Sequence, residues 1–188
     1  MDSNANHSDL RLITVDPGHF HAALLQKQQL PGVASEANVY APLGPDLLAH
    51  LDRVSRFNAR TENPTNWKLR VYAGEDFLEK MIAEVPGNVA VFSGRNAKKL
   101  DLIEAAVNAG LHVLADKPLI LERAQHPKLR GVLETARRRN LVVADAMTQR
   151  FEITCQLVRL LVNDPAIFGE RVAGSPEDPA VRMESIHY

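Results

Sequence analysis

Residues 110–118 read GLHVLADKP, and they are the most informative stretch of the sequence. An apolar run typical of a β-strand, Leu111 to Ala115, ends on a carboxylate, an amine and a proline. Proline stops a strand and stiffens the chain that leaves it. Because ligands of open α/β sheets bind at the carboxyl ends of strands, we expect Asp116, Lys117 and Pro118 at the floor of a pocket. The alternative is a solvated lysine after an edge strand, and the rest of the chain bears on that choice.

Apolar runs of this kind alternate with helical patterns along most of the chain. The expected strands are 10–15, 38–41, 69–73, 88–93, 111–115 and 141–145. The expected helices are 19–29, 46–57, 75–85, 96–109, 126–140 and 149–162. This alternation predicts a doubly wound α/β fold, in which a mostly parallel, Rossmann-like sheet carries helices on both faces.

The composition indicates a globular protein and excludes several classes of partner. The 188 residues are 45% hydrophobic and 24% charged, with a net charge of −1, so no electrostatic footprint for nucleic acid or an anionic membrane is present. No apolar run approaches the ~18 residues that cross a membrane. The single cysteine, Cys155, fits a reducing, cytoplasmic compartment and, because it lies in an apolar-periodic stretch, is expected to be buried.

The first strand-to-helix turn, residues 15–22, reads VDPGHFHA. A dinucleotide-binding fold carries G-x-G-x-x-G at this turn. Aligned on Gly18, the sequence keeps the middle glycine and has Asp16 and His21 in place of the other two. We expect Gly18, His19 and Phe20 to contact the cofactor, although the Asp16 carboxylate would repel a pyrophosphate.

His19 and His21 also raise the question of a metal site. Residues two apart do not share a helix face, and no cysteine or third histidine is placed to complete a ligand set. We therefore expect no metal, with His19 as a polar loop contact and His21 packed at the start of the helix.

The second strand gives no signal for the choice of cofactor. In NAD-binding domains of this fold an acidic residue at the end of that strand binds the ribose. Here the strand ends Tyr40-Ala41-Pro42, and Asp46 and Arg53 come later, in the helix. The choice between NAD and NADP therefore stays open.

Taken together, these residues resemble the Gfo/Idh/MocA family, the glucose-fructose oxidoreductase and inositol dehydrogenase group. The family pattern A-G-K-H-V-x-x-E-K-P is similar to residues 109–118, AGLHVLADKP, with Asp116 where the family has glutamate. Residues 141–151, LVVADAMTQRF, are similar to the strand and Arg-Phe pair that follow in the family. The resemblance extends from Leu10 to about Phe168.

The resemblance implies a role for several residues. Lys117 would lie beside the nicotinamide and the substrate oxygen, where it could polarise that oxygen or move its proton. The fourth strand of the family ends in a Thr-Pro-Asn-type sequence, and this chain keeps Asn96 of it. Ser93 and Gly94 would still line the cofactor through their backbone.

The resemblance also implies a domain organisation. Residues 1–9 are expected to be a disordered lead-in and residues 10–148 the dinucleotide-binding domain. Residues 149–188 are expected to be a linking helix and the start of a truncated substrate domain, with His187 too near the end of the chain to be catalytic.

The implied function is an NAD(P)-dependent oxidoreductase that acts on a sugar, polyol or related hydroxyl compound when full length. The partners would be a small-molecule substrate and, where the half-built sheet pairs, a second copy of the chain. A non-catalytic nucleotide or sugar sensor on the same fold is the alternative. A receiver-like domain is a third reading, from Asp16, Asp116, Asp145 and Lys117, but the first turn lacks its paired acid.

Overall fold

A computed structural model describes residues 10–146, 151–170, 172–175 and 177–180. The chain separates into two compact units, Met1–Ala146 and Met147–Tyr188. The first unit contains the sheet, and the second contains two helices. No helix in the described ranges is both long and apolar enough to span a bilayer.

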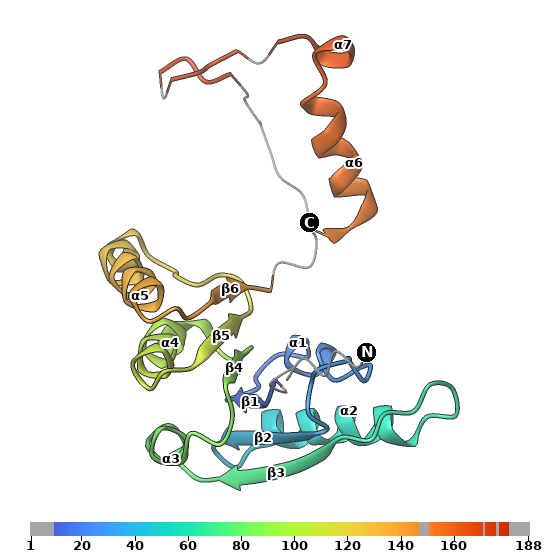
Figure 1. The fold of residues 1–188 in the computed structure, drawn as a ribbon. Helices are drawn as coiled ribbons and strands as arrows, with labels where there is room; N and C mark the ends of the chain where they lie inside the picture. Colours follow the sequence, from blue (N-terminus) through green and yellow to red (C-terminus); the bar gives the residue numbers. More distant parts are fainter. Residues whose placement is uncertain (1–9, 147–150, 171, 176, 181–188) are drawn as a thin grey trace, which may run out of the picture. The chain divides into compact units, whose positions relative to one another are not determined.

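The sheet of the first unit has six strands, all parallel (Figure 1). They are β1 (Leu12–Val15), β2 (Glu36–Ala41), β3 (Lys68–Ala73), β4 (Val89–Phe92), β5 (His112–Ala115) and β6 (Val143–Asp145). Their order is β3-β2-β1-β4-β5-β6, which is the order of a doubly wound dinucleotide-binding sheet. The predicted fold class is confirmed.

Helices cover both faces of this sheet. They are α1 (His21–Leu24), α2 (Pro45–Ala59), α3 (Phe77–Glu84), α4 (Lys99–Asn108) and α5 (His126–Arg138), with single 3₁₀ turns at Asn96–Lys98 and Arg123–Gln125. Ile13 of β1 packs in a core with residues of α3, α4 and α5, whereas the adjacent Leu12 packs with residues of α1 and α2. Both faces of β1 are thus buried, which explains its continuous apolar run.

Helix α1 is much shorter than the predicted helix 19–29 and makes a single turn. Beyond α1 the backbone bonds are of the i→i−3 type, with the N–H groups of Gln26 and Lys27 donating to the carbonyls of Ala23 and Leu24. Gln26 is also held by a distant residue, because its carbonyl accepts a hydrogen bond from Nε1 of Trp67 at 2.7 Å and its side chain is buried. The predicted length of this helix is wrong.

The second unit contains α6 (Ile153–Val162) and α7 (Pro165–Phe168). None of the residues described in it is buried, and Ile153 and Leu160 of α6 are 78% and 70% exposed. Cys155 is exposed, so the prediction that it is buried is wrong. The apolar residues of α6 do recur at helical spacing, but the described residues of this unit form no core that covers them. Arg150 and His187 lie outside the described residues.

Candidate functional site

The predicted site residues meet at one edge of the sheet. The strand register places Val15, Phe92 and Ala115 side by side at the carboxyl ends of β1, β4 and β5. Asp16, Ser93 and Asp116 therefore follow these three strands at neighbouring positions. In sheets of this kind, ligands bind just beyond the carboxyl ends of the strands. The site lies where the strand order reverses, which in this sheet is between β1 and β4.

The turns after β1 and β4 pack directly against each other. A Cβ atom built at Gly94 would lie 2.3 Å from the carbonyl oxygen of Asp16, a distance that real side chains do not adopt. A Cβ atom at Gly18 would lie 3.3 Å from the Cα atom of Gly94, which is tight but tolerable. Gly94 is thus required for the close approach of the two turns, and Asp16 takes a left-handed backbone conformation with φ of 45°.

Asp16 is partly withdrawn from water at this contact. Burial raises the pKa of Asp16 above its ordinary value, and the nearby Asp46 carboxylate raises it further, against the smaller opposing effect of Arg95 and Lys98. Two carboxylates and two cationic side chains therefore determine the electrostatic potential that a phosphate group would meet at this turn.

A cavity of about 420 Å³ opens beside the same two turns. Its polar lining includes Asp16, Asp46, Arg95 and Lys98. The closest side-chain atoms of Arg95 and Asp46 lie 3.8 Å apart, and both side chains are substantially exposed. Asp46 stands in the first turn of α2, close after the end of β2, and is the acidic residue of this cavity nearest to that strand end in the sequence.

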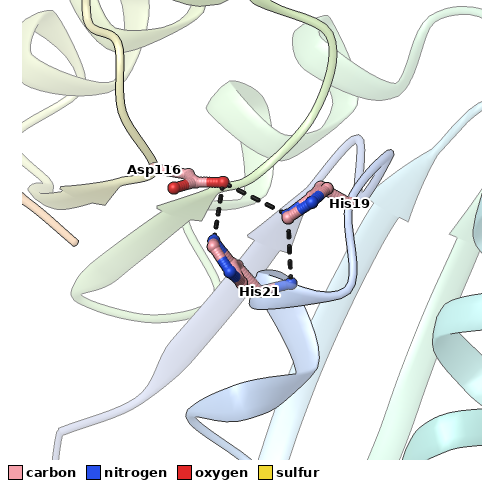
Figure 2. A group of neighbouring side chains, drawn as sticks. All are labelled: His19, His21 and Asp116. Carbon is pink, nitrogen blue, oxygen red and sulfur yellow. Dashed lines mark hydrogen bonds and ion pairs between the residues drawn. The ribbon is translucent and has the colours of Figure 1, made fainter. Parts of the chain in front are cut away.

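His19, His21 and Asp116 form a cluster above the end of β5 (Figure 2). Oδ2 of Asp116 lies 3.3 Å from Nδ1 of His19 and 3.0 Å from Nδ1 of His21. The two rings are edge to face with centroids 4.3 Å apart, and the backbone N–H of His21 donates to Nδ1 of His19. Burial and the neighbouring His21 lower the pKa of His19, which favours its neutral form.

Asp116 is buried, and its two carboxylate oxygens differ in their surroundings. Oδ2 faces the two histidines and also accepts a long hydrogen bond, 3.4 Å, from the hydroxyl of Ser93. Oδ1 is buried and has no hydrogen-bond donor among the described residues. Asp116 directly follows β5, as the sequence predicts, but nothing in the sequence indicates that the first turn supplies the partners of its carboxylate.

Lys99 was missed by the sequence reasoning and holds the Asp116–Pro118 loop in place. Its Nζ donates to the carbonyl oxygens of Asp116 at 2.8 Å and of Pro118 at 3.4 Å, and to the side chain of Asn96. The side chain is 2% exposed, and burial lowers the pKa of the amine. Its position in phase with the buried Ile103 and Ala106 on α4 is the signal that could have found it.

Lys117 and Pro118 are exposed, and the peptide bond between them is cis. Lys117 makes no hydrogen bond or ion pair with the residues that the structure describes, so its amine is available to a ligand. Of the other predicted contacts, Phe20 is 46% exposed beside His19, and Asn96 is engaged by Lys99.

The fold and these turns together define a dinucleotide-binding type of site. Comparison with solved structures gives a protein from Parabacteroides merdae ATCC 43184, a presumed oxidoreductase, at 46% identity and a TM-score of 0.86. The match covers 92% of this chain and 39% of that one.

More distant structures share the fold. A myo-inositol 2-dehydrogenase from Lactobacillus plantarum is 16% identical with a TM-score of 0.60, and the match covers 85% of this chain and 42% of the dehydrogenase. Biliverdin reductase from Synechocystis sp. PCC 6803, solved with biliverdin and NADP⁺, is 14% identical with a TM-score of 0.58, over 80% of this chain and 42% of the reductase.

These structural neighbours are oxidoreductases of the Gfo/Idh/MocA type, which confirms the resemblance predicted from residues 109–118. The chain spans about two fifths of the length of the structures it matches. No family model and no curated protein matches the sequence.

Proposed function

We propose that residues 10–146 bind NAD or NADP and form the cofactor-binding part of an oxidoreductase that acts on a sugar, a polyol or a related hydroxyl compound. One observation carries the proposal. The β3-β2-β1-β4-β5-β6 sheet brings a cavity of about 420 Å³ and the Asp116–Pro118 loop to the same edge, at the β1–β4 pair where the strand order reverses. This is the position at which such sheets bind dinucleotides.

The residues present fit a dinucleotide. Gly18 and Gly94 let the turns after β1 and β4 pack closely against each other, which holds both turns together at the edge where a pyrophosphate would bind. Ser93 and Asn96 add polar groups at the end of β4, while His19 and Phe20 border the turn after β1.

Lys117 is proposed as the catalytic residue. When bound, the nicotinamide supplies or accepts the hydride. The exposed Lys117 amine, with Asp116 and Pro118 beside it, would polarise the substrate oxygen or exchange a proton with it. Lys99 fixes the backbone on both sides of Lys117 through the carbonyls of Asp116 and Pro118 and so limits where that amine can lie.

The substrate class rests on the neighbours rather than on this chain. They include the myo-inositol 2-dehydrogenase and a UDP-N-acetylglucosamine 3-dehydrogenase from Acidithiobacillus ferrooxidans. Both are dehydrogenases of polyhydroxylated compounds, and both share only the fold with this chain. The single cysteine adds support for a cytoplasmic location.

Titration of the 188-residue protein with NADH and NADPH, followed by nicotinamide fluorescence and calorimetry, tests the proposal. Asp46 suits the ribose hydroxyls of NAD, whereas Arg95 and Lys98 suit the 2′-phosphate of NADP. Asp46→Ala should weaken NADH binding more, and Arg95→Ala should weaken NADPH binding more. Failure of both dinucleotides to bind at millimolar concentration would refute cofactor binding by this chain.

A sensor without catalysis is the second candidate, because Asp16 and His21 replace two signature glycines. Such a sensor would bind a dinucleotide but would not catalyse hydride transfer to or from a substrate. A protein that continues this chain with a substrate domain, assayed on a panel of sugars and polyols, distinguishes the two. Turnover that Lys117→Ala abolishes supports the enzyme, and tight binding without turnover supports the sensor.

A further inference from the structure

We propose that His19, His21 and Asp116 form a binding site for one divalent transition-metal ion such as Zn²⁺. The ligand atoms would be Oδ2 of the aspartate and Nδ1 of each histidine, with the metal replacing the 3.5 Å contact from the backbone N–H of His21 to Nδ1 of His19. These side chains come from the turn after β1 and the end of β5, and each offers one ligand atom within 4.8 Å of the others (Figure 2).

The spacing of the ligand atoms fits a metal ion. In a tetrahedral zinc site with metal–ligand distances of about 2.0–2.1 Å, neighbouring ligand atoms lie about 3.3 Å apart. The two distances to Oδ2 of Asp116 are 3.3 Å from His19 and 3.0 Å from His21. His19 is half exposed, so its side chain has room to adjust around an ion, whereas His21 and Asp116 are held more firmly.

The objection from sequence spacing does not hold in the structure. Residues two apart diverge on a helix, but α1 begins at His21, so His19 precedes it. Both imidazoles can therefore turn to the same side, and Figure 2 shows them facing one carboxylate. The third ligand comes from Asp116, which is 95 residues further along the chain than His21.

The charge of Asp116 also favours a cation. The carboxylate is buried, its Oδ1 has no donor among the described residues, and the nearest buried amine, Lys99, binds the Asp116 carbonyl. A buried carboxylate is costly unless a positive charge or several hydrogen bonds compensate it. A divalent ion between Asp116 and two neutral imidazoles provides that compensation.

A three-ligand site leaves coordination open. Catalytic zinc sites keep a fourth position for water or substrate, whereas structural sites fill all four positions with protein ligands. In the sequence, His19 follows Gly18 directly and Asp116 precedes Lys117 directly. The open coordination position would therefore be next to the proposed dinucleotide site. The described residues add no fourth protein ligand to the cluster.

The test is metal binding to the 188-residue protein, prepared without a histidine tag and freed of metal with a chelator. Co²⁺ titration followed by visible absorption, with Zn²⁺ calorimetry and elemental analysis, should show one ion per chain and the intense bands of tetrahedral Co²⁺. His21→Ala and Asp116→Asn should each weaken binding more than about tenfold, since loss of a metal's supporting contacts alone costs about 10–100-fold.

His126→Ala is the matched control, because His126 is an exposed histidine outside the cluster. It should leave Co²⁺ affinity and the spectrum unchanged. His19→Ala, at the most exposed ligand, guards against loss of folding, which circular dichroism checks for each variant. Absence of a one-to-one ion, or unchanged binding in His21→Ala, would show that the cluster is a hydrogen-bonded His–Asp pair without metal.

The result is independent of the proposed oxidoreductase function. Metal binding without NADH binding supports the site and counts against the cofactor. NADH binding without metal binding supports the cofactor and overturns the site.

Discussion

At the scale of single residues, a buried polar side chain without a hydrogen-bond partner lowers the stability of the fold. His50 on α2 is 1% exposed, and neither ring nitrogen has a partner among the described residues. Burial, helped by the nearby Arg53, lowers the pKa of His50 to about 4. The neutral imidazole is therefore the form that the folded protein keeps.

This gives a pH-dependent stability with a definite sign. The unfolded chain protonates His50 below about pH 6.5, whereas the folded protein does so only near pH 4. Between these values the unfolded state binds more protons, so stability falls as pH falls, by up to about 1.4 kcal/mol per pH unit. Urea unfolding of the wild type and His50→Leu at several pH values should give a flatter pH dependence for the variant. Equal slopes would contradict the assignment to His50.

Lys99 supports the Asp116–Pro118 loop. Lys99→Met keeps much of the apolar stem but removes the ammonium, which leaves the carbonyls of Asp116 and Pro118 without this donor. We expect a loss of about 1–3 kcal/mol in the free energy of unfolding, together with weaker NADH binding. The control is Lys27→Met, at an exposed lysine outside the site. Equal effects of the two substitutions on denaturant unfolding would contradict the role of Lys99.

At the scale of elements, the contact between the turns after β1 and β4 decides the shape of the site. Gly94→Ala places a methyl group against the Asp16 carbonyl, and overpacking of this kind costs about 1–3 kcal/mol. Gly131→Ala on α5 meets open space and should be neutral or stabilising by about 0.5–1 kcal/mol. Thermal unfolding of both variants measures the difference. A Gly94→Ala protein as stable as Gly131→Ala would show that the turns do not touch.

The same elements show what the sequence predicts well. Apolar residues indicated every strand of the sheet to within a few residues. The central strands β1 and β4 are the clearest, because a strand buried on both faces is continuously apolar, whereas the edge strand β3 is mostly exposed and keeps polar residues. The position of Asp116–Pro118 directly after β5 was predicted from the same kind of apolar run. The end of a strand can be recognised from its local sequence. Because the strands are parallel, their carboxyl ends all lie at the same edge of the sheet.

Features that depend on distant partners were not predicted. The segment after α1 is bonded through Gln26 to Trp67, 41 residues further along the chain. The cluster at His19 needs Asp116 from another strand, and spacing along the chain cannot show that pairing. Cys155 has a helical apolar pattern, but a pattern does not say whether anything covers the helix. Lys99 is different, because its phase on α4 was visible in the sequence.

At the scale of the whole molecule, the described site residues all come from the first unit, Met1–Ala146. We therefore expect a chain ended at residue 146 to fold and to bind NADH with the affinity of the 188-residue protein. Calorimetric titration of both proteins makes the comparison. Loss of binding in the shorter protein would mean that residues 147–188 contribute to the site or to its stability.

The central claim is that the carboxyl edge of β1, β4 and β5 binds the dinucleotide. Its most direct test is amide NMR of the ¹⁵N-labelled 188-residue protein titrated with NADH. The predicted result is saturable shifts centred on Gly18, Gly94 and Lys117, which Gly94→Ala weakens and Gly131→Ala leaves unchanged. Shifts confined to other surfaces, or none at millimolar NADH, would contradict the claim.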